Sequence, residues 1–343
     1  MEYKIVAKKD ISSLLDRLIR LYRVYAPVRR NGLFLFEAVK SGADASLDYS
    51  KTKMSPKAFL FPESEDLFHY QSKGKSAKIG LPPLEDHYGQ ILFGIRPCDA
   101  KGIQFLDRFF GRDPSDPYYQ ERRSKTVIVS LGCRERHNGC FCTTLGGSPC
   151  AEDGSDLLLI DIGDEYLVRI LSDKGAALTK DEEMAEAWEE QIIAAADVAR
   201  RAEEAVSPNL ELEGAGDRLI ERFNDPVWDT ISEKCVGCGV CTYLCPTCHC
   251  FDICDEVICQ EGTRIRIWDS CQYPLFTKEA SGHNPRNTQG KRMRRRIMHK
   301  FKYLPEKQDM WGCTGCGRCV TECPVNLDIR QVLTILLKGD GVR

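Results

Sequence analysis

The sequence predicts a mixed α/β or α+β domain over residues 1–210, followed by a smaller module of helices and loops over 211–343. In the first part, short apolar runs typical of buried strands alternate with helical patterns. The cysteines are concentrated in the second part, since 13 of the 18 lie from Cys235 onward. The stretch SPNLELEGAGD at 207–217 is the predicted linker, which puts the domain boundary near residue 210.

The first domain is expected to begin with an amphipathic helix over 10–25, with Asp10 as its N-cap. A strand follows at 31–39. Two apolar runs around a Gly-Asp turn predict a hairpin at 156–171. An Ala- and Glu-rich run over 179–206 predicts a long helix with an acidic, solvated face, and a short helix then leads into the cysteine-rich module.

The composition excludes several classes of protein. The 343 residues are 42% hydrophobic and 29% charged, with a formal net charge of −3, which is ordinary for a globular protein and unsuited to binding polyanions. The chain has no signal-peptide pattern and no run of 18 apolar residues, so a cytoplasmic protein without a membrane span is expected. In such a protein, 18 cysteines indicate metal binding and not disulfides, and they suit an oxygen-poor habitat.

Two cysteine runs repeat one spacing, C-x2-C-x2-C-x3-C-P, and begin at Cys235 and at Cys313. This is the spacing of bacterial ferredoxins with two [4Fe-4S] clusters, in which three cysteines of a run bind one cluster and the fourth binds the other. Zinc sites use two C-x2-C pairs and do not account for the triads followed by Cys-Pro. The first cluster is therefore expected on Cys235, Cys238, Cys241 and Cys323. The second is expected on Cys313, Cys316, Cys319 and Cys245.

Each run also contains two glycines, which let the backbone approach a cluster and aim N–H groups at sulfur. They are Gly237, Gly239, Gly315 and Gly317. Neither run leaves a ligand position open for a substrate. Since such clusters carry single electrons, we expect residues 211–343 to form a bacterial two-[4Fe-4S] ferredoxin-like module, with a long insert, that transfers electrons.

The insert separates the two runs by 67 residues, where a small ferredoxin has a short hairpin. It carries five more cysteines, Cys248, Cys250, Cys254, Cys259 and Cys271. Cys248, Cys250 and Cys271 are either packed thiols beside the clusters or further ligands. Cys254 and Cys259 have the character of spare thiols.

The insert also holds eight Lys and Arg residues and no acid between Arg286 and Lys302. Nucleic acid could bind such a run, but no recognition fold surrounds it. A helical face that contacts a partner subunit or shields a cluster is favoured instead, and its positive charge would raise the potential of a nearby cluster. No nucleic-acid partner is therefore expected.

A third metal site is expected in the first domain. Buried strands at 90–97 and 125–132, with a helical pattern between them, predict a β-α-β unit with a parallel pair. A cysteine follows each strand, at the sheet edge where α/β proteins place their ligands, and two more lie in the next Gly-rich loop. The four are Cys98, Cys133, Cys140 and Cys142, with Cys150 in reserve. A third iron–sulfur cluster is favoured, and zinc or four unconnected buried thiols are the alternatives.

Arg96, Asp99 and His137 lie beside these cysteines and either support such a site or satisfy local backbone groups. The chain has no GxGxxG motif after a strand and no Walker loop. Flavin and nicotinamide are therefore expected on another chain.

Several phrases of the sequence together resemble one family, namely GIRPCDAKGI, CFCTTLGGSP, CVGCGVCTYLCPTCHCFD, WDSCQYPLFTKEASGHNPR and RRRIMHKFKY. Over nearly the whole chain it is similar to the 4Fe-4S dicluster family, which includes an iron–sulfur component of anaerobic sulfite reductase. The same family includes the beta (iron–sulfur) subunit of sulfhydrogenase-type NiFe hydrogenases. The family's pattern covers the eight ferredoxin cysteines, the four of the first domain, and Cys248, Cys250 and Cys271. It leaves out Cys150, Cys254 and Cys259.

The resemblance implies a subunit that relays electrons between an NAD(P)H-linked flavoprotein of the ferredoxin-NADP reductase type and a catalytic or bifurcating subunit. That subunit would be of the sulfite reductase, NiFe hydrogenase or heterodisulfide reductase type. The alternative is a redox enzyme whose N-terminal cysteine-bound cluster itself binds and reduces a substrate. A redox sensor that binds DNA through the basic run is a third hypothesis.

Overall fold

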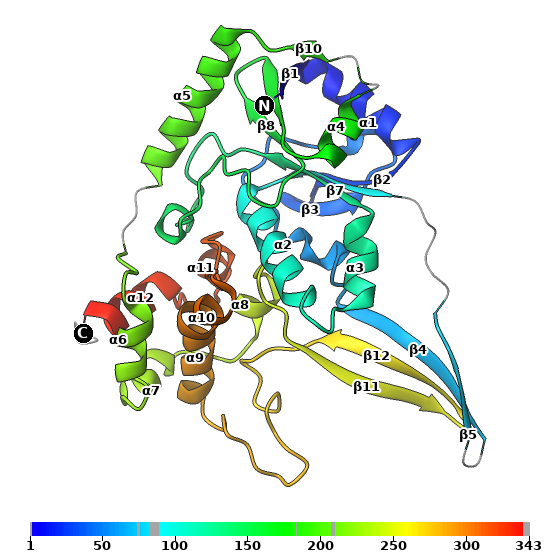
Figure 1. Cartoon of the computed structure of the whole chain (residues 1–343). Coiled ribbons are helices and arrows are strands. Elements are labelled where there is room, and N and C mark those ends of the chain that lie inside the picture. The colour runs from blue at the N-terminus through cyan, green and yellow to red at the C-terminus, as the bar shows by residue number, and fades with distance from the viewer. Residues whose placement is uncertain are drawn as a thin grey trace.

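The computed structural model describes residues 2–338 except 74–75, 83–88, 181, 183 and 207–209. Its largest element is an eight-stranded sheet with the order β10-β1-β9-β8-β7-β6-β2-β3 (Figure 1). Neighbours from β8 to β2 are parallel and the outer pairs are antiparallel. The strands are β1 (Glu2–Ala7), β2 (Arg23–Arg30), β3 (Leu33–Ala38), β6 (Gln90–Ile95), β7 (Thr126–Leu131), β8 (Leu157–Asp161), β9 (Glu165–Ile170) and β10 (Ala185–Glu186).

Helices cover both faces of this sheet because its central strands are apolar on both sides. Along β7, Val127 and Val129 face a core completed by α1 (Ile11–Ile19) and α4 (Asp173–Thr179), while Ile128 faces the opposite core. That opposite face is covered by α2 (Pro97–Phe110), α3 (Pro117–Ser124) and α5 (Glu189–Ala205).

Most of the expected elements of the first domain are present. The β6-α2-β7 unit with its parallel strands, the β8–β9 hairpin and the strand at 31–39 (β3) are confirmed. The helix expected over 10–25 is confirmed over Ile11–Ile19 (α1) and wrong in its last part, because residues 23–25 belong to β2, and the Asp10 side chain makes no capping hydrogen bond. The long helix over 179–206 is wrong in its first part, because α5 begins only at Glu189. Before α5, residues 185–186 form β10, which pairs with β1. The backbone N–H and C=O groups of this segment therefore bond to the sheet and not to one another within a helix.

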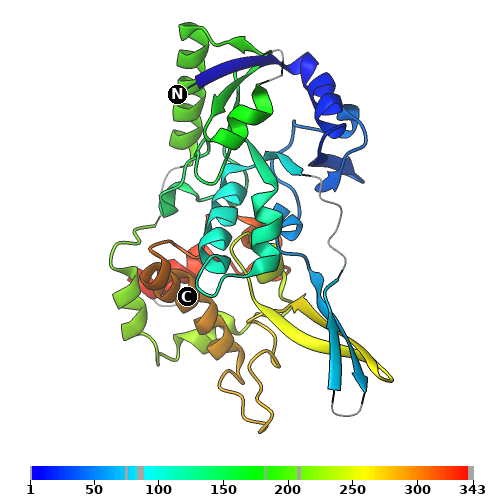
Figure 2. The same ribbon diagram turned by 45° about the vertical axis from the view of Figure 1, so that its right-hand side comes forward.

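A second sheet joins the two predicted domains. It is antiparallel, with the order β11-β12-β4-β5, and extends from the body of the molecule as an arm (Figures 1 and 2). Two of its strands, β4 (Ser64–Lys73) and β5 (Ser76–Gly80), precede residue 210, whereas β11 (Phe251–Ile258) and β12 (Glu261–Trp268) belong to the insert. The boundary near 210 stays a prediction, and residues 207–209 of the expected linker lie outside the described residues.

The remaining helices build the cysteine-rich module around a core that includes Leu219, Trp228, Ile297 and Leu333. The helix expected before the first cysteine run is split in two at Pro226. The helices are α6 (Ala215–Glu221), α7 (Val227–Ser232), α8 (Val240–Tyr243), α9 (Gln289–Met298), the π-helical turn His299–Tyr303, α10 (Leu304–Gln308), α11 (Arg318–Thr321) and α12 (Ile329–Lys338). In the described part of the chain, no helix has both the length and the apolar character that a membrane crossing requires.

Candidate metal centres

The two cysteine runs fold in the same way. In each, the first glycine has φ +66° and the second has φ +76° and caps a one-turn helix, α8 or α11. Left-handed backbone favours glycine, which accounts for Gly237, Gly239, Gly315 and Gly317. The repeated spacing therefore corresponds to a repeated loop that turns three thiols towards one side.

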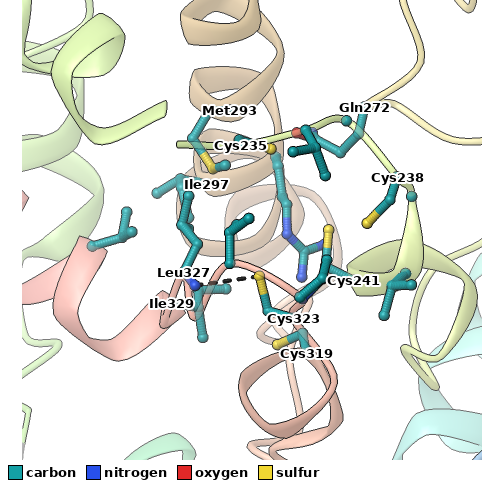
Figure 3. Close-up of a pocket in the computed structure, with 18 residues that line it drawn as sticks. Cys235, Cys238, Cys241, Gln272, Met293, Ile297, Cys319, Cys323, Leu327 and Ile329 are labelled. Atoms are coloured by element: carbon teal, nitrogen blue, oxygen red, sulfur yellow. Dashed lines mark hydrogen bonds between the residues drawn. The ribbon is translucent and has the colours of Figure 1, made fainter. Parts of the chain in front are cut away.

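The first predicted ligand set lines one cavity. Figure 3 shows the thiols of Cys235, Cys238, Cys241 and Cys323 around it, although Cys323 comes from the other run. Two donors point at these sulfurs: the Leu327 N–H lies 3.2 Å from Cys323 Sγ, and Gln289 Nε2 lies 3.1 Å from Cys235 Sγ. N–H donors to sulfur are the support that a cluster-bound thiolate requires.

The second set is more deeply buried. Burial, with the nearby charge of Cys245, raises the pKa of the thiols of Cys313, Cys316 and Cys319, for Cys316 to about 12. Cys245 itself accepts a hydrogen bond from Lys300 Nζ at 3.3 Å. A hydrogen bond from Cys248, with Lys300 and Arg296 nearby, lowers the pKa of Cys245 although burial opposes it. The fourth cysteine of the first run thus lies among the first three of the second run.

The third predicted set also converges. Cys98, in the first turn of α2, and Cys133, just after β7, line one cavity with Cys140 and Cys142. Gly315 and Cys316 form part of the same wall. This loop is anchored to the second cysteine run, because the Phe141 N–H donates to the Gly315 carbonyl at 2.9 Å. Cys150 is buried beside Cys133, with its thiol directed at the Cys133 carbonyl, and does not line this cavity.

Of the three neighbours of the third set, Arg96 and His137 line its cavity. Arg96 is buried and donates only to backbone carbonyls, including that of Gly132 at 2.9 Å. His137 Nε2 is buried with no hydrogen-bond partner among the described residues, and burial lowers the pKa of this imidazole to about 4. Asp99 instead forms a fully buried ion pair with Arg318, with oxygen–nitrogen distances of 2.6 and 2.8 Å.

Buried positive charge fits anionic groups in these cavities. Arg96, Arg296 and Lys300 are 5%, 4% and 4% exposed, and none forms an ion pair with a carboxylate among the described residues. Burying an unpaired cation is costly, so each requires an anion close by. A [4Fe-4S] cluster with four thiolates supplies negative charge, and Arg296 lines the cavity of the first set.

The described residues contain no three Cys, His, Asp or Glu side chains that close on a single metal ion. The thiols of the first and third sets stand instead around the walls of a cavity, which is how ligands surround a cubane.

The basic run of the insert supplies side chains that face the cysteine sulfurs. Arg292, Arg296 and Lys300 are buried, at four-residue intervals along α9 and the π-helical turn, so one face of this helix points inward. Gln289, at the start of α9, reaches Cys235, and Lys300 reaches Cys245. These individual roles were not predicted, although the i, i+4 spacing of the cations is visible in the sequence.

The remaining insert cysteines divide into two groups. Cys248, Cys250 and Cys271 line a further cavity beside Arg296 and Lys300. Cys254 and Cys259 lie on the projecting arm and line none of the described cavities.

This fold and its thiol-lined cavities define an iron–sulfur protein of the electron-transfer class. Residues 234–327 match the family described as the 4Fe-4S dicluster domain. The chain is 35% identical over 342 residues to sulfhydrogenase 2 subunit beta of Pyrococcus furiosus, and the match covers 99% of each chain. It therefore belongs to the 4Fe-4S dicluster family of this beta subunit, as the sequence phrases had indicated. No solved structure matches it.

Proposed function

We propose that this chain is the electron-transfer subunit between an NAD(P)H-linked flavoprotein of the ferredoxin-NADP reductase type and a catalytic or bifurcating redox subunit in the cytoplasm. The relative is named as a subunit of a sulfhydrogenase, which supports a place in a complex with a NiFe hydrogenase. Sulfite reductase and heterodisulfide reductase types of partner suit the same chain.

One observation carries this proposal: the thiol sets adjoin one another in a row. Gly315 and Cys316 of the second run form part of the wall of the third cavity. Cys319 of the same run forms part of the wall of the first cavity. The second set therefore lies between the other two, and one-electron carriers in this order would span the chain.

The ligands proposed are those grouped above. The first [4Fe-4S] cluster takes Cys235, Cys238, Cys241 and Cys323, the second takes Cys313, Cys316, Cys319 and Cys245, and the third takes Cys98, Cys133, Cys140 and Cys142. Flavin and nicotinamide are assigned to the flavoprotein partner. Cys238 and Val236 are exposed, so the first cluster is the one that a docked partner reaches at the surface.

Anaerobic purification with iron and sulfide analysis tests the proposal. The three proposed clusters require about twelve irons per chain, and Cys133→Ala should remove about four of them. NAD(P)H should reduce the clusters only after the flavoprotein is added. Stoichiometric FAD bound to this chain alone would contradict the assignment of flavin to a partner. Unchanged iron content in Cys133→Ala would contradict the third cluster.

The second candidate is a redox enzyme that reduces a substrate at the third site. It is favoured by His137, which lines that cavity and whose Nε2 has no hydrogen-bond partner in the described part of the chain, so that it could donate a hydrogen bond or a proton to a bound molecule. A change in the spectrum of the third cluster on adding sulfite or a disulfide, abolished by His137→Ala, would favour this function. An unchanged spectrum would contradict this second candidate and leave electron transfer as the one proposed function.

A further inference from the structure

A further thiol-lined cavity lies at the root of the projecting arm. Cys250 directly precedes β11, and Cys271 lies three residues after β12. Pairing of Phe251 with Trp268, and the Asp269 N–H bond to the Cys250 carbonyl at 3.0 Å, bring the two strand ends together. Both thiols line the cavity with a third, that of Cys248, so the hairpin closes a site that the sequence spacing does not reveal.

Three buried cations surround these thiols. Lys57, Arg296 and Lys300 are 2%, 4% and 4% exposed, and in the part of the chain that the structure describes none of them is ion-paired with a carboxylate. Lys57 Nζ donates to the Cys248 carbonyl at 2.8 Å, and Arg296 Nη1 lies 3.9 Å from Cys248 Sγ.

The ferredoxin cysteines account for part of this charge, since Cys245 accepts the Lys300 hydrogen bond and Arg296 also lines the cavity of the first set. Lys57 instead donates to the backbone of Cys248, and an unpaired cation in the interior requires negative charge close by. The thiols of this further cavity are the groups placed to supply it.

One of these thiols has a donor beside its sulfur. The Gln272 side-chain amide donates to Cys271 Sγ at 3.5 Å. An N–H donor to sulfur is the support that a cluster-bound thiolate requires.

The cavity is also lined by two imidazoles, those of His249 and His299. His249 Nδ1 lies 2.9 Å from the Thr247 carbonyl, which fixes the proton on that nitrogen and leaves Nε2 with a free lone pair. A metal-binding histidine has this arrangement.

We propose that this cavity holds a fourth iron–sulfur cluster, with Cys248, Cys250 and Cys271 as thiolate ligands and His249 as the remaining ligand. Its position next to Cys245 places it beside the second cluster, as a branch from the row of three. The inference goes beyond the proposed function and does not depend on the third cluster, because different cysteines are involved.

Iron analysis of single variants tests it on the full chain, purified without oxygen. Cys250→Ser should lose about four irons relative to the wild type, whatever the wild-type total, and should keep the EPR signals of the ferredoxin clusters. Cys254→Ser is the matched control, since Cys254 lies four residues further along the same hairpin outside the cavity, and it should keep all the iron. Equal iron in the two variants, with Cys250 and Cys271 recovered as a free dithiol or a disulfide, overturns the proposal.

A second variant covers the case in which Cys250→Ser does not fold. His249→Cys keeps a ligand at the same position but replaces imidazole by thiolate, which should lower the reduction potential of one cluster and shift its EPR signal while the iron content stays constant. Unchanged spectra and potentials in His249→Cys would show that His249 is no ligand. If Cys133→Ala loses iron and Cys250→Ser does not, the result supports the third cluster and counts against the fourth.

Discussion

The two cysteine runs share one spacing and one loop conformation, but they lie in opposite surroundings. In the first run, Val236 is 66% exposed and Cys238 is exposed, whereas the equivalent Thr314 is 4% exposed and Cys316 is buried. Val240 in the first run corresponds to Arg318 in the second, which is 1% exposed. Since the spacing is the same in both runs, any difference in stability and reduction potential between the two proposed clusters comes from their surroundings.

The hydrogen bonds to the cysteine sulfurs also differ between the first and the second set. The first set receives neutral donors, the Gln289 amide and a backbone N–H, whereas Cys245 of the second set receives the ammonium group of Lys300. Positive charge at a thiolate stabilises the reduced, more negative cluster. We therefore expect the second cluster to have the higher reduction potential, so that an electron rests in the interior of the chain.

The largest effect is expected from making the second run like the first at the Arg318 position. Arg318→Val leaves the Asp99 carboxylate buried without its partner, at a cost of about 3–5 kcal/mol of stability. The apparent melting temperature should fall steeply. The double variant with Asp99→Leu should recover part of the loss, and equal melting of the single variant and the wild type would show that the ion pair is unimportant.

A glycine comparison should give the next largest effect. An added Cβ at Gly315 would lie 2.6 Å from the backbone of Phe141, whereas at the equivalent Gly237 its nearest neighbour is the Gln289 side chain at 3.5 Å. Gly315→Ala should therefore cost about 3 kcal/mol and reduce iron incorporation. Gly237→Ala should cost only the left-handed strain of about 1–2 kcal/mol. Similar melting and iron content in the two variants would contradict this difference in packing.

Removing the ammonium group should bring the potentials of the two clusters together. Lys300→Met deletes a charged hydrogen bond to Cys245, with a free energy of about 2 kcal/mol, and should lower the second potential by on the order of 100 mV. EPR-monitored redox titration measures this shift. Lys291→Met removes one charge from the same helix but its ammonium bonds Asn287, so both potentials should stay almost constant.

The smallest effect is expected at the first cluster. Gln289→Leu removes a neutral hydrogen bond to Cys235, with a free energy of about 1 kcal/mol, and should lower that potential by about 40 mV. The second potential should not change. Equal shifts in the reduction potentials of both clusters would mean that Gln289 does not act through its hydrogen bond to Cys235.

Much of the site was predictable where its geometry is local. The cysteine triads, their glycines and the parallel unit that carries Cys98 and Cys133 follow from patterns within a few residues or from one β-α-β connection. The failures are long-range. The helix expected from residue 179 lost its first part to pairing with β1, and the pairing of β4 with β12 leaves no signal in either segment.

The sequence by itself determined the 4Fe-4S class of cofactor and predicted the grouping of the eight ferredoxin cysteines, because ligand spacing within a short loop limits which thiols can face one cluster. Only the tertiary structure decided which of two identical loops is buried, and which basic residues of the insert face sulfur. Burial and the pairing of charges depend on contacts between segments far apart in the sequence, such as Asp99 with Arg318 and Lys57 with Cys248. Those contacts distinguish two motifs that are the same in spacing.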